Sequence, residues 1–154
     1  KKTASLFSSC AEIGALSVGA SAEDVARARQ IGEYIGICIQ IRDDIFDYYS
    51  NDVRKPTGND MREGKLTLPN IYAVRTQGDE HIRTMIDRLK EGERSDTEIN
   101  ELITFAKACG GIEYAEHTMQ NYRQKALALL PENIDENVKN AVIAYVDAVI
   151  NRKK

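Results

Sequence analysis

The sequence has few of the residues that interrupt or cross-link a chain. Its 154 residues include 3 prolines and 10 glycines, so long helices can run without breakers. The 3 cysteines are odd in number and widely spaced, which argues against a disulfide framework or a zinc site. All three lie in apolar stretches, where free cysteine behaves as a small hydrophobic residue. We therefore expect reduced core cysteines in a cytoplasmic protein.

Positive charge and long apolar runs are also scarce. Lysine and arginine number 21 against 24 aspartates and glutamates, a formal net charge of −3 that argues against nonspecific nucleic-acid binding. No apolar run approaches the roughly 20 residues of a transmembrane helix. Hydrophobic residues make up 42% of the chain, enough for one domain with a sizeable core.

Hydrophobic periodicity predicts an all-α fold, and no useful segment alternates with the period of a strand. Ser21 with Asp24, Ser95 with Glu98, and Asp135 are expected to cap helices. Pro69 opens a helix at its favoured first-turn position. The predicted helices span residues 3–19, 22–49, 69–76, 80–91, 96–109, 112–130 and 135–150.

The segment 51–68 combines turn-forming and charged residues with few apolar ones. It is predicted to be a loop, and loops of this length in compact domains are often functional. Its cations are suited to phosphate, because lysine acts as a flexible point charge toward anions. A mixed-charge surface loop is the alternative. The cations are Arg54, Lys55, Arg62 and Lys65.

The helix before this loop ends in an acidic cluster. At about 100° per residue, Gln40, Asp43, Asp44 and Asp47 fall on one arc of the helix. Like charges four residues apart repel, so a cation should relieve them. Oxygen ligands on a helix suit Mg²⁺, which bridges one or two carboxylates to substrate phosphates. A solvated acidic face is the alternative interpretation.

These motifs, in this order, resemble the C-terminal half of the trans-isoprenyl (polyprenyl) diphosphate synthases. The resemblance covers roughly residues 1–70. It rests on Lys2-Thr3-Ala4, Gln40-x-x-Asp43-Asp44-x-x-Asp47, Lys55-x-x-Gly58-x-Asp60 and Lys65-x-Thr67-x-Pro69. It implies an isoprenoid-synthase helical bundle in which residues 1–50 form active-site helices, 51–68 the diphosphate-binding loop and 69–154 peripheral helices.

The resemblance also implies a reaction. Two Asp-rich motifs hold Mg²⁺ on an allylic diphosphate, which ionises, and isopentenyl diphosphate adds to the allylic cation to give a chain five carbons longer. Asp43 matches a direct metal ligand, with Asp44 and Asp47 completing the motif. Lys2, Lys55 and Lys65 match lysines that contact the diphosphate. Thr3 and Gln40 match residues that line the cation.

The chain departs from the family pattern in two respects. Ile39 replaces the aromatic residue that commonly precedes the motif glutamine. The first Asp-rich motif and the basic residues that bind isopentenyl diphosphate are absent, so the chain resembles half an active site. We expect it to be inactive alone, to need the N-terminal half of the same synthase, and to belong to a homodimer when complete. The alternatives are a non-catalytic helical subunit of a heteromeric synthase and a ligand-free acidic adaptor.

Overall fold

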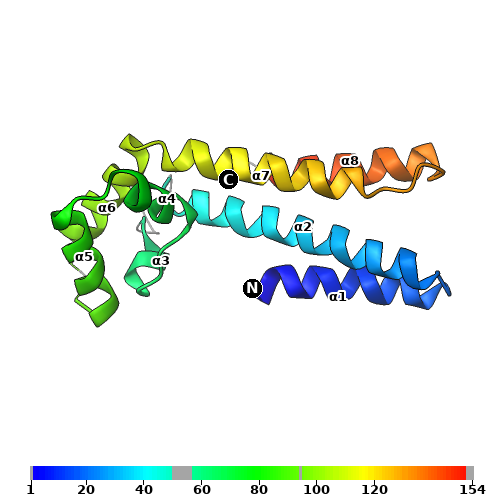
Figure 1. Ribbon diagram of the computed structural model, residues 1–154, viewed down its shortest axis with the longest axis horizontal. Coiled ribbons are helices and arrows are strands. Elements are labelled where there is room, and N and C mark those ends of the chain that lie inside the picture. Colours follow the sequence, from blue (N-terminus) through cyan, green and yellow to red (C-terminus); the bar gives the residue numbers. More distant parts are fainter. Residues whose placement is uncertain (1, 50–56, 94, 152–154) are drawn as a thin grey trace. The chain divides into compact units, whose positions relative to one another are not determined.

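The computed structural model describes residues 2–49, 57–93 and 95–151. Every regular element in these ranges is a helix, which confirms the all-α prediction (Figure 1). The chain divides into two compact units, residues 1–42 with 118–154, and residues 43–117. The helices are α1 (Lys2–Ser17), α2 (Ala22–Phe46), α3 (Asn59–Arg62), α4 (Leu68–Gln77), α5 (Glu80–Glu91), α6 (Asp96–Ala108), α7 (Gly111–Ala128) and α8 (Glu136–Ile150).

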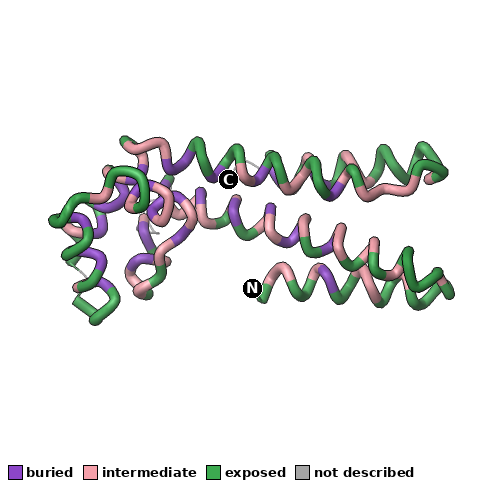
Figure 2. The backbone as a smooth tube through the Cα atoms, viewed as in Figure 1, coloured by how far each residue is buried: buried purple, intermediate pink, exposed green. Residues whose placement is uncertain are grey.

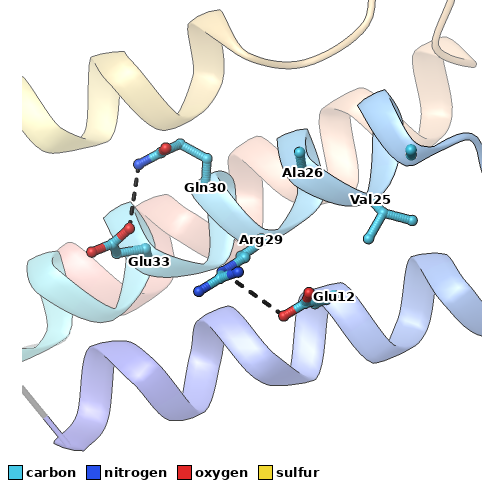
Figure 3. A pocket seen from close by; sticks show the side chains of 7 residues that line it. Glu12, Val25, Ala26, Arg29, Gln30 and Glu33 are labelled. Atoms are coloured by element: carbon cyan, nitrogen blue, oxygen red, sulfur yellow. Dashed lines mark hydrogen bonds and ion pairs between the residues drawn. The ribbon is translucent and has the colours of Figure 1, made fainter.

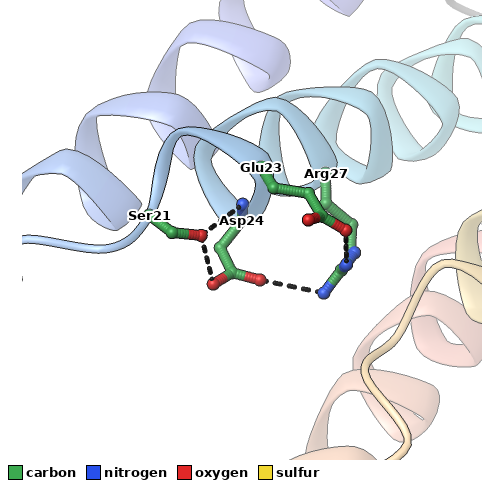
Figure 4. A network of polar contacts seen from close by, with 4 residues as sticks. All are labelled: Ser21, Glu23, Asp24 and Arg27. Atoms are coloured by element: carbon green, nitrogen blue, oxygen red, sulfur yellow. Dashed lines mark hydrogen bonds and ion pairs between the residues drawn. The ribbon is translucent and has the colours of Figure 1, made fainter.

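Helix α2 begins at the cap that the sequence predicts (Figure 4). The Ser21 hydroxyl accepts the Asp24 backbone N–H at 3.1 Å and donates to the Asp24 carboxylate at 2.7 Å. Arg27 then reaches back to Asp24 at 2.9 Å and to Glu23 at 2.8 Å. The cap satisfies a backbone donor that the helix itself leaves unpaired. The carboxylates of Glu23 and Asp24 lie at the positive end of the helix dipole, where negative charge is stabilising.

Helix α1 runs beside α2 in the first unit because two glycines of α2 leave room for its backbone (Figure 1). A Cβ on Gly32 would lie 2.5 Å from the Phe7 carbonyl oxygen, and one on Gly36 would lie 2.6 Å from the Ala4 Cα. The interface therefore depends on backbone contact rather than on large interlocking side chains. It also sets the register of the first turn of α1 against the later turns of α2.

The opposite side of α2 carries the apolar contacts of this unit. Cys38 is fully buried, and its thiol donates a hydrogen bond to the Met119 carbonyl of α7. Burial raises the pKa of this thiol to about 11. The rings of Tyr34 and Tyr122 lie 5.6 Å apart. Helix α8 is tied to α7 by an ion pair between Arg123 and Asp147 at 2.6 Å, which lowers the pKa of the Asp147 carboxyl.

The second unit is built around contacts between α4 and α6. Ile99 and Leu102 of α6 are fully buried, and Figure 2 shows buried positions along both helices. The first residue of α7, Gly111, approaches the Pro69 carbonyl so closely that a Cβ would lie 2.5 Å from it. Ser95 caps α6 by accepting the Glu98 N–H at 3.2 Å, as its sequence predicts.

Several helices begin or end a few residues from the predicted positions, and two differences from the prediction bear on the site. Helix α2 ends at Phe46 rather than at residue 49, because Tyr48 and Tyr49 donate to carbonyls three residues back and so tighten the last turn. The segment predicted to be a loop contains α3, a helix of 4 residues. Such a short helix has no hydrophobic period for the sequence to reveal, and its existence depends on tertiary contacts.

None of the helices in the described ranges is long and apolar enough to cross a membrane.

The glycine contact between α1 and α2 generates a prediction. Gly36→Ala places a methyl group against the Ala4 backbone, whereas Gly14→Ala, also inside a helix, meets nothing within 4 Å. Both changes gain the same helix propensity, so their difference isolates the clash. Urea unfolding should show Gly36→Ala less stable than Gly14→Ala by about 1–3 kcal/mol. Equal stabilities would show that the helices separate without cost.

Candidate active site

The last turns of α2 carry the polar residues that the sequence predicts to form a site. Ile41 and Ile45 are 6% and 7% exposed and hold this part of the helix in its core. Gln40 and Asp43 are exposed and Asp44 is half-buried. The helix thus buries its isoleucines and places the Gln40 amide and the Asp43 carboxylate at its surface.

Thr3 and Gln40 come together in the first unit. The Thr3 hydroxyl donates to the Gln40 side-chain carbonyl at 3.2 Å, across the close contact between α1 and α2. Lys2, in the first turn of α1, and Gln40 both line a cavity of about 620 Å³ whose wall includes Ile37 and Ile41. The structure therefore gathers three of the predicted site residues at one end of the α1–α2 pair.

A second cavity of about 480 Å³ between the same helices is polar (Figure 3). Arg29 lies 3.8 Å from the Glu12 carboxylate, and Gln30 donates to Glu33 at 3.3 Å. Arg29 is the single cation among the lining residues, against the carboxylates of Glu12 and Glu33, so this cavity is not suited to a substrate anion.

Asp47 lies just beyond the end of α2 and holds the start of α3. One carboxylate oxygen accepts the backbone N–H of Asn59 at 2.9 Å and its side-chain amide at 3.1 Å. The other oxygen accepts the Asp60 N–H at 3.0 Å, and the Asp47 carbonyl accepts the Gly58 N–H at 3.0 Å. The acidic end of α2 is thereby joined directly to the predicted diphosphate-binding loop.

Packing against α6 holds α3 on its other side. Gly58 has a φ of 76°, and a Cβ there would lie 2.6 Å from Cγ2 of Ile99. Met61 is 1% exposed, and Arg62 forms an ion pair with Asp96. A glycine is required at position 58 for both conformation and space, because side chains rarely adopt this backbone region.

Tyr48 fixes the far end of the loop, and sequence reasoning missed it. Its hydroxyl is buried, lies 2.9 Å from the Thr67 hydroxyl and has a raised pKa because of that burial. Thr67 immediately precedes α4. The contact between the two hydroxyls therefore joins the residue that follows Asp47 to the beginning of α4. A tyrosine following an acidic motif gives no sign in the sequence of which hydroxyl it will contact.

Lys65 lies near the C-terminal end of the predicted loop, and its positive charge is exposed. Its ammonium donates to the Glu63 carboxylate at 2.5 Å, which lowers the pKa of Glu63 and raises that of Lys65. Burial and the nearby Asp47 charge raise the pKa of Asp60, and Lys65 partly offsets them. The ion pair of Lys65 with Glu63 is exposed on both sides, so it lies at the surface of the loop.

The predicted residues fall into separate groups. Lys2, Thr3 and Gln40 belong to the first unit, whereas Asp43, Asp44, Asp47 and Lys65 belong to the second. Lys55 and Arg54 lie outside the described residues. Among the residues that the structure describes, no group of three or more His, Cys, Asp or Glu side chains is placed to hold a metal by itself. The metal-ligand assignment of the aspartates remains a prediction.

Comparison with known proteins places this arrangement in a family. Residues 1–106 match the polyprenyl synthetase family. The chain belongs to that family. A curated member, nonaprenyl diphosphate synthase from Mycobacterium tuberculosis, is 33% identical over 159 residues, covering 99% of this chain and 46% of the relative.

Solved structures of family members share the fold. Geranylgeranyl pyrophosphate synthase from Bacteroides thetaiotaomicron matches with a TM-score of 0.92 and 51% identity, over 97% of this chain and 50% of that one. A polyprenyl synthase from Caulobacter crescentus, complexed with calcium and isoprenyl diphosphate, matches at a TM-score of 0.83 and 27% identity, over 99% and 47%. The chain thus spans about half the length of the family members that it matches.

The packing of α3 against α6 can be tested by substituting two glycines. Gly58 and Gly92 both have positive φ, at 76° and 99°, so alanine strains either backbone. Only at Gly58 does the added Cβ clash, whereas Gly92 has nothing within 4 Å. We expect Gly58→Ala to reduce the free energy of unfolding by about 1–3 kcal/mol more than Gly92→Ala. Chemical denaturation of both variants measures the difference, and matched losses would argue against the packing described.

Proposed function

We propose that this chain is the C-terminal half of a prenyltransferase that condenses an allylic diphosphate with isopentenyl diphosphate to give a longer all-trans prenyl diphosphate. The observation that carries the proposal is the direct link between the acidic end of α2 and the loop that bears Lys65. Asp47 makes this link through its hydrogen bonds to Asn59 and Asp60. Family membership supports the same reaction class.

The donor set of α2 fits Mg²⁺. Asp43 and Asp44 offer carboxylate oxygens, exposed and half-buried respectively, at the end of a helix. Magnesium typically takes one or two protein carboxylates and completes its shell with water and substrate phosphates, so a pair of carboxylates is sufficient on this side. Bound Mg²⁺ would supply Lewis-acid stabilisation of the negative charge on the departing diphosphate.

The chain's own residues would then bind and orient the allylic substrate. Lys65, like Lys2 and Lys55 under this proposal, offers a point charge to the diphosphate. The Gln40 carbonyl oxygen, held by the Thr3 hydroxyl at 3.2 Å, presents a fixed dipole toward positive charge that develops at the allylic carbon. Preorganised dipoles of this kind stabilise a cation without a reorganisation cost during the reaction.

The proposed partner of the chain is the N-terminal half of the same synthase, within a homodimer of complete chains. Helix α1 supports this proposal. Leu6, Ile13 and Leu16 are 62%, 64% and 58% exposed, and apolar side chains so exposed along one helix indicate an interaction surface. We also propose a cytoplasmic location, in keeping with three free cysteines.

Pyrophosphate binding tests the role of the loop. We expect the purified chain to bind inorganic pyrophosphate only with Mg²⁺, and Lys65→Ala to weaken this binding about tenfold by removing one charge-assisted contact. Lys90→Ala, which removes an exposed lysine of α5 paired with Asp87, is the matched control and should bind as wild type does. Isothermal titration calorimetry gives both affinities. Absence of magnesium-dependent binding would favour the adaptor alternative.

Chain elongation is a second test. We supply the purified chain with Mg²⁺, an allylic diphosphate and radiolabelled isopentenyl diphosphate. It should not form an elongated prenyl diphosphate, because the sequence lacks the first Asp-rich motif. Thin-layer chromatography of the extracted products makes the measurement. A labelled, longer product would show that these residues complete an active site by themselves.

A further inference from the structure

Three N–H groups of the chain donate to the carboxylate of Asp47. Its Oδ1 accepts from the backbone and side-chain N–H groups of Asn59, at 2.9 and 3.1 Å, and its Oδ2 accepts from the Asp60 N–H at 3.0 Å. A carboxylate has about four lone-pair positions, so three of them are already engaged. A metal ion at Asp47 would have to share a carboxylate that is satisfied by N–H donors.

We propose that Asp47 is a positioning residue, which holds α3 and the Lys65 turn in place for the diphosphate, rather than a ligand of the metal. The inference rests on the proposed function for what the loop binds. It gives Asp47 a structural task, while the metal-ligand role proposed for Asp43 and Asp44 is unchanged.

Helix α3 depends on such an anchor because it is only 4 residues long. A helix this short cannot offset the cost of its own nucleation, and its first N–H groups lack partners within the helix. Gly58, which precedes it, has no side chain with which to cap it. Asp47 supplies the missing acceptors with a full negative charge at the end of the helix where negative charge is favourable.

The anchor is transmitted to Lys65 through the backbone. The Lys65 N–H donates to the Asp60 carbonyl at 2.8 Å, and the Gly64 N–H donates to the Met61 carbonyl at 2.8 Å. Asp60, which Asp47 holds directly, is therefore the residue around which the chain turns to place Lys65. Loss of the Asp47 carboxylate would release this turn while leaving the lysine itself intact.

Hydrogen exchange on the purified 154-residue chain without metal tests the anchor directly. Asp47→Ala should raise the exchange rates of the Asn59 and Asp60 amides about tenfold or more, because each loses a charged acceptor. Asp43→Ala, on the same acidic motif, is the matched control and should leave these two amides unchanged. Unchanged exchange in Asp47→Ala would overturn the proposal.

A milder variant keeps the test valid if Asp47→Ala does not fold. Asp47→Asn has nearly the same volume but only one acceptor oxygen, so one of the two backbone amides keeps its partner and the other faces an NH₂ group. We expect faster exchange at one of Asn59 and Asp60 and not at both. Wild-type rates at both amides would contradict the anchoring role.

Magnesium dependence separates positioning from ligation. Asp43→Ala should raise the Mg²⁺ concentration needed for half-maximal pyrophosphate binding. Asp47→Ala should weaken pyrophosphate binding at saturating Mg²⁺ and leave that midpoint where wild type has it. A midpoint shift as large as that of Asp43→Ala would show Asp47 to be a ligand. If wild type binds no pyrophosphate, the proposed function fails, and the exchange rates still decide whether Asp47 anchors α3.

Discussion

The hydrogen bonds of Asp47 are the interaction on which the segment after α2 depends. Helix α2 ends at Phe46, and Asp47 is the next residue. Its carboxylate accepts the N–H groups of Asn59 and Asp60, and its carbonyl accepts the Gly58 N–H. Asp43 and Asp47 are four residues apart, where like charges repel by a few tenths of a kcal/mol, so these N–H donors also favour the Asp47 charge. The start of α3, and through it the backbone turn that leads to Lys65, is held by this one side chain.

A second condition is the backbone contact at Gly32 and Gly36. Because these residues bring α1 against α2, the first turn of α1 lies beside Gln40, and the Thr3 hydroxyl can reach its amide. The two polar groups are too far apart in sequence to meet through local structure. Small residues in the interior of α2 therefore determine which side chains meet near its end.

Local features of the fold could be predicted from the sequence, and the long-range ones could not. The caps at Ser21, Ser95 and Asp135 form as expected, because each depends on donors two or three residues away. Helix α3 was not predicted, since it has no periodicity and exists through Asp47 and Ile99. The contact of Tyr48 with Thr67 was missed because it also joins residues that are distant in sequence. The selection of Thr3 and Gln40 relied on the ordered motifs of the family, and the structure adds that they touch.

The contact of Gly58 with Ile99 makes two positions that are far apart in sequence depend on each other. Position 58 combines a positive φ with a methyl group of Ile99 that lies 2.6 Å from where a Cβ would be. A side chain at position 58 therefore requires the residue at position 99 to shift or to be smaller. Asn and Asp are the side chains that best tolerate such a backbone. We expect a substitution at this loop position to be compensated in α6, although the two elements look unrelated in sequence.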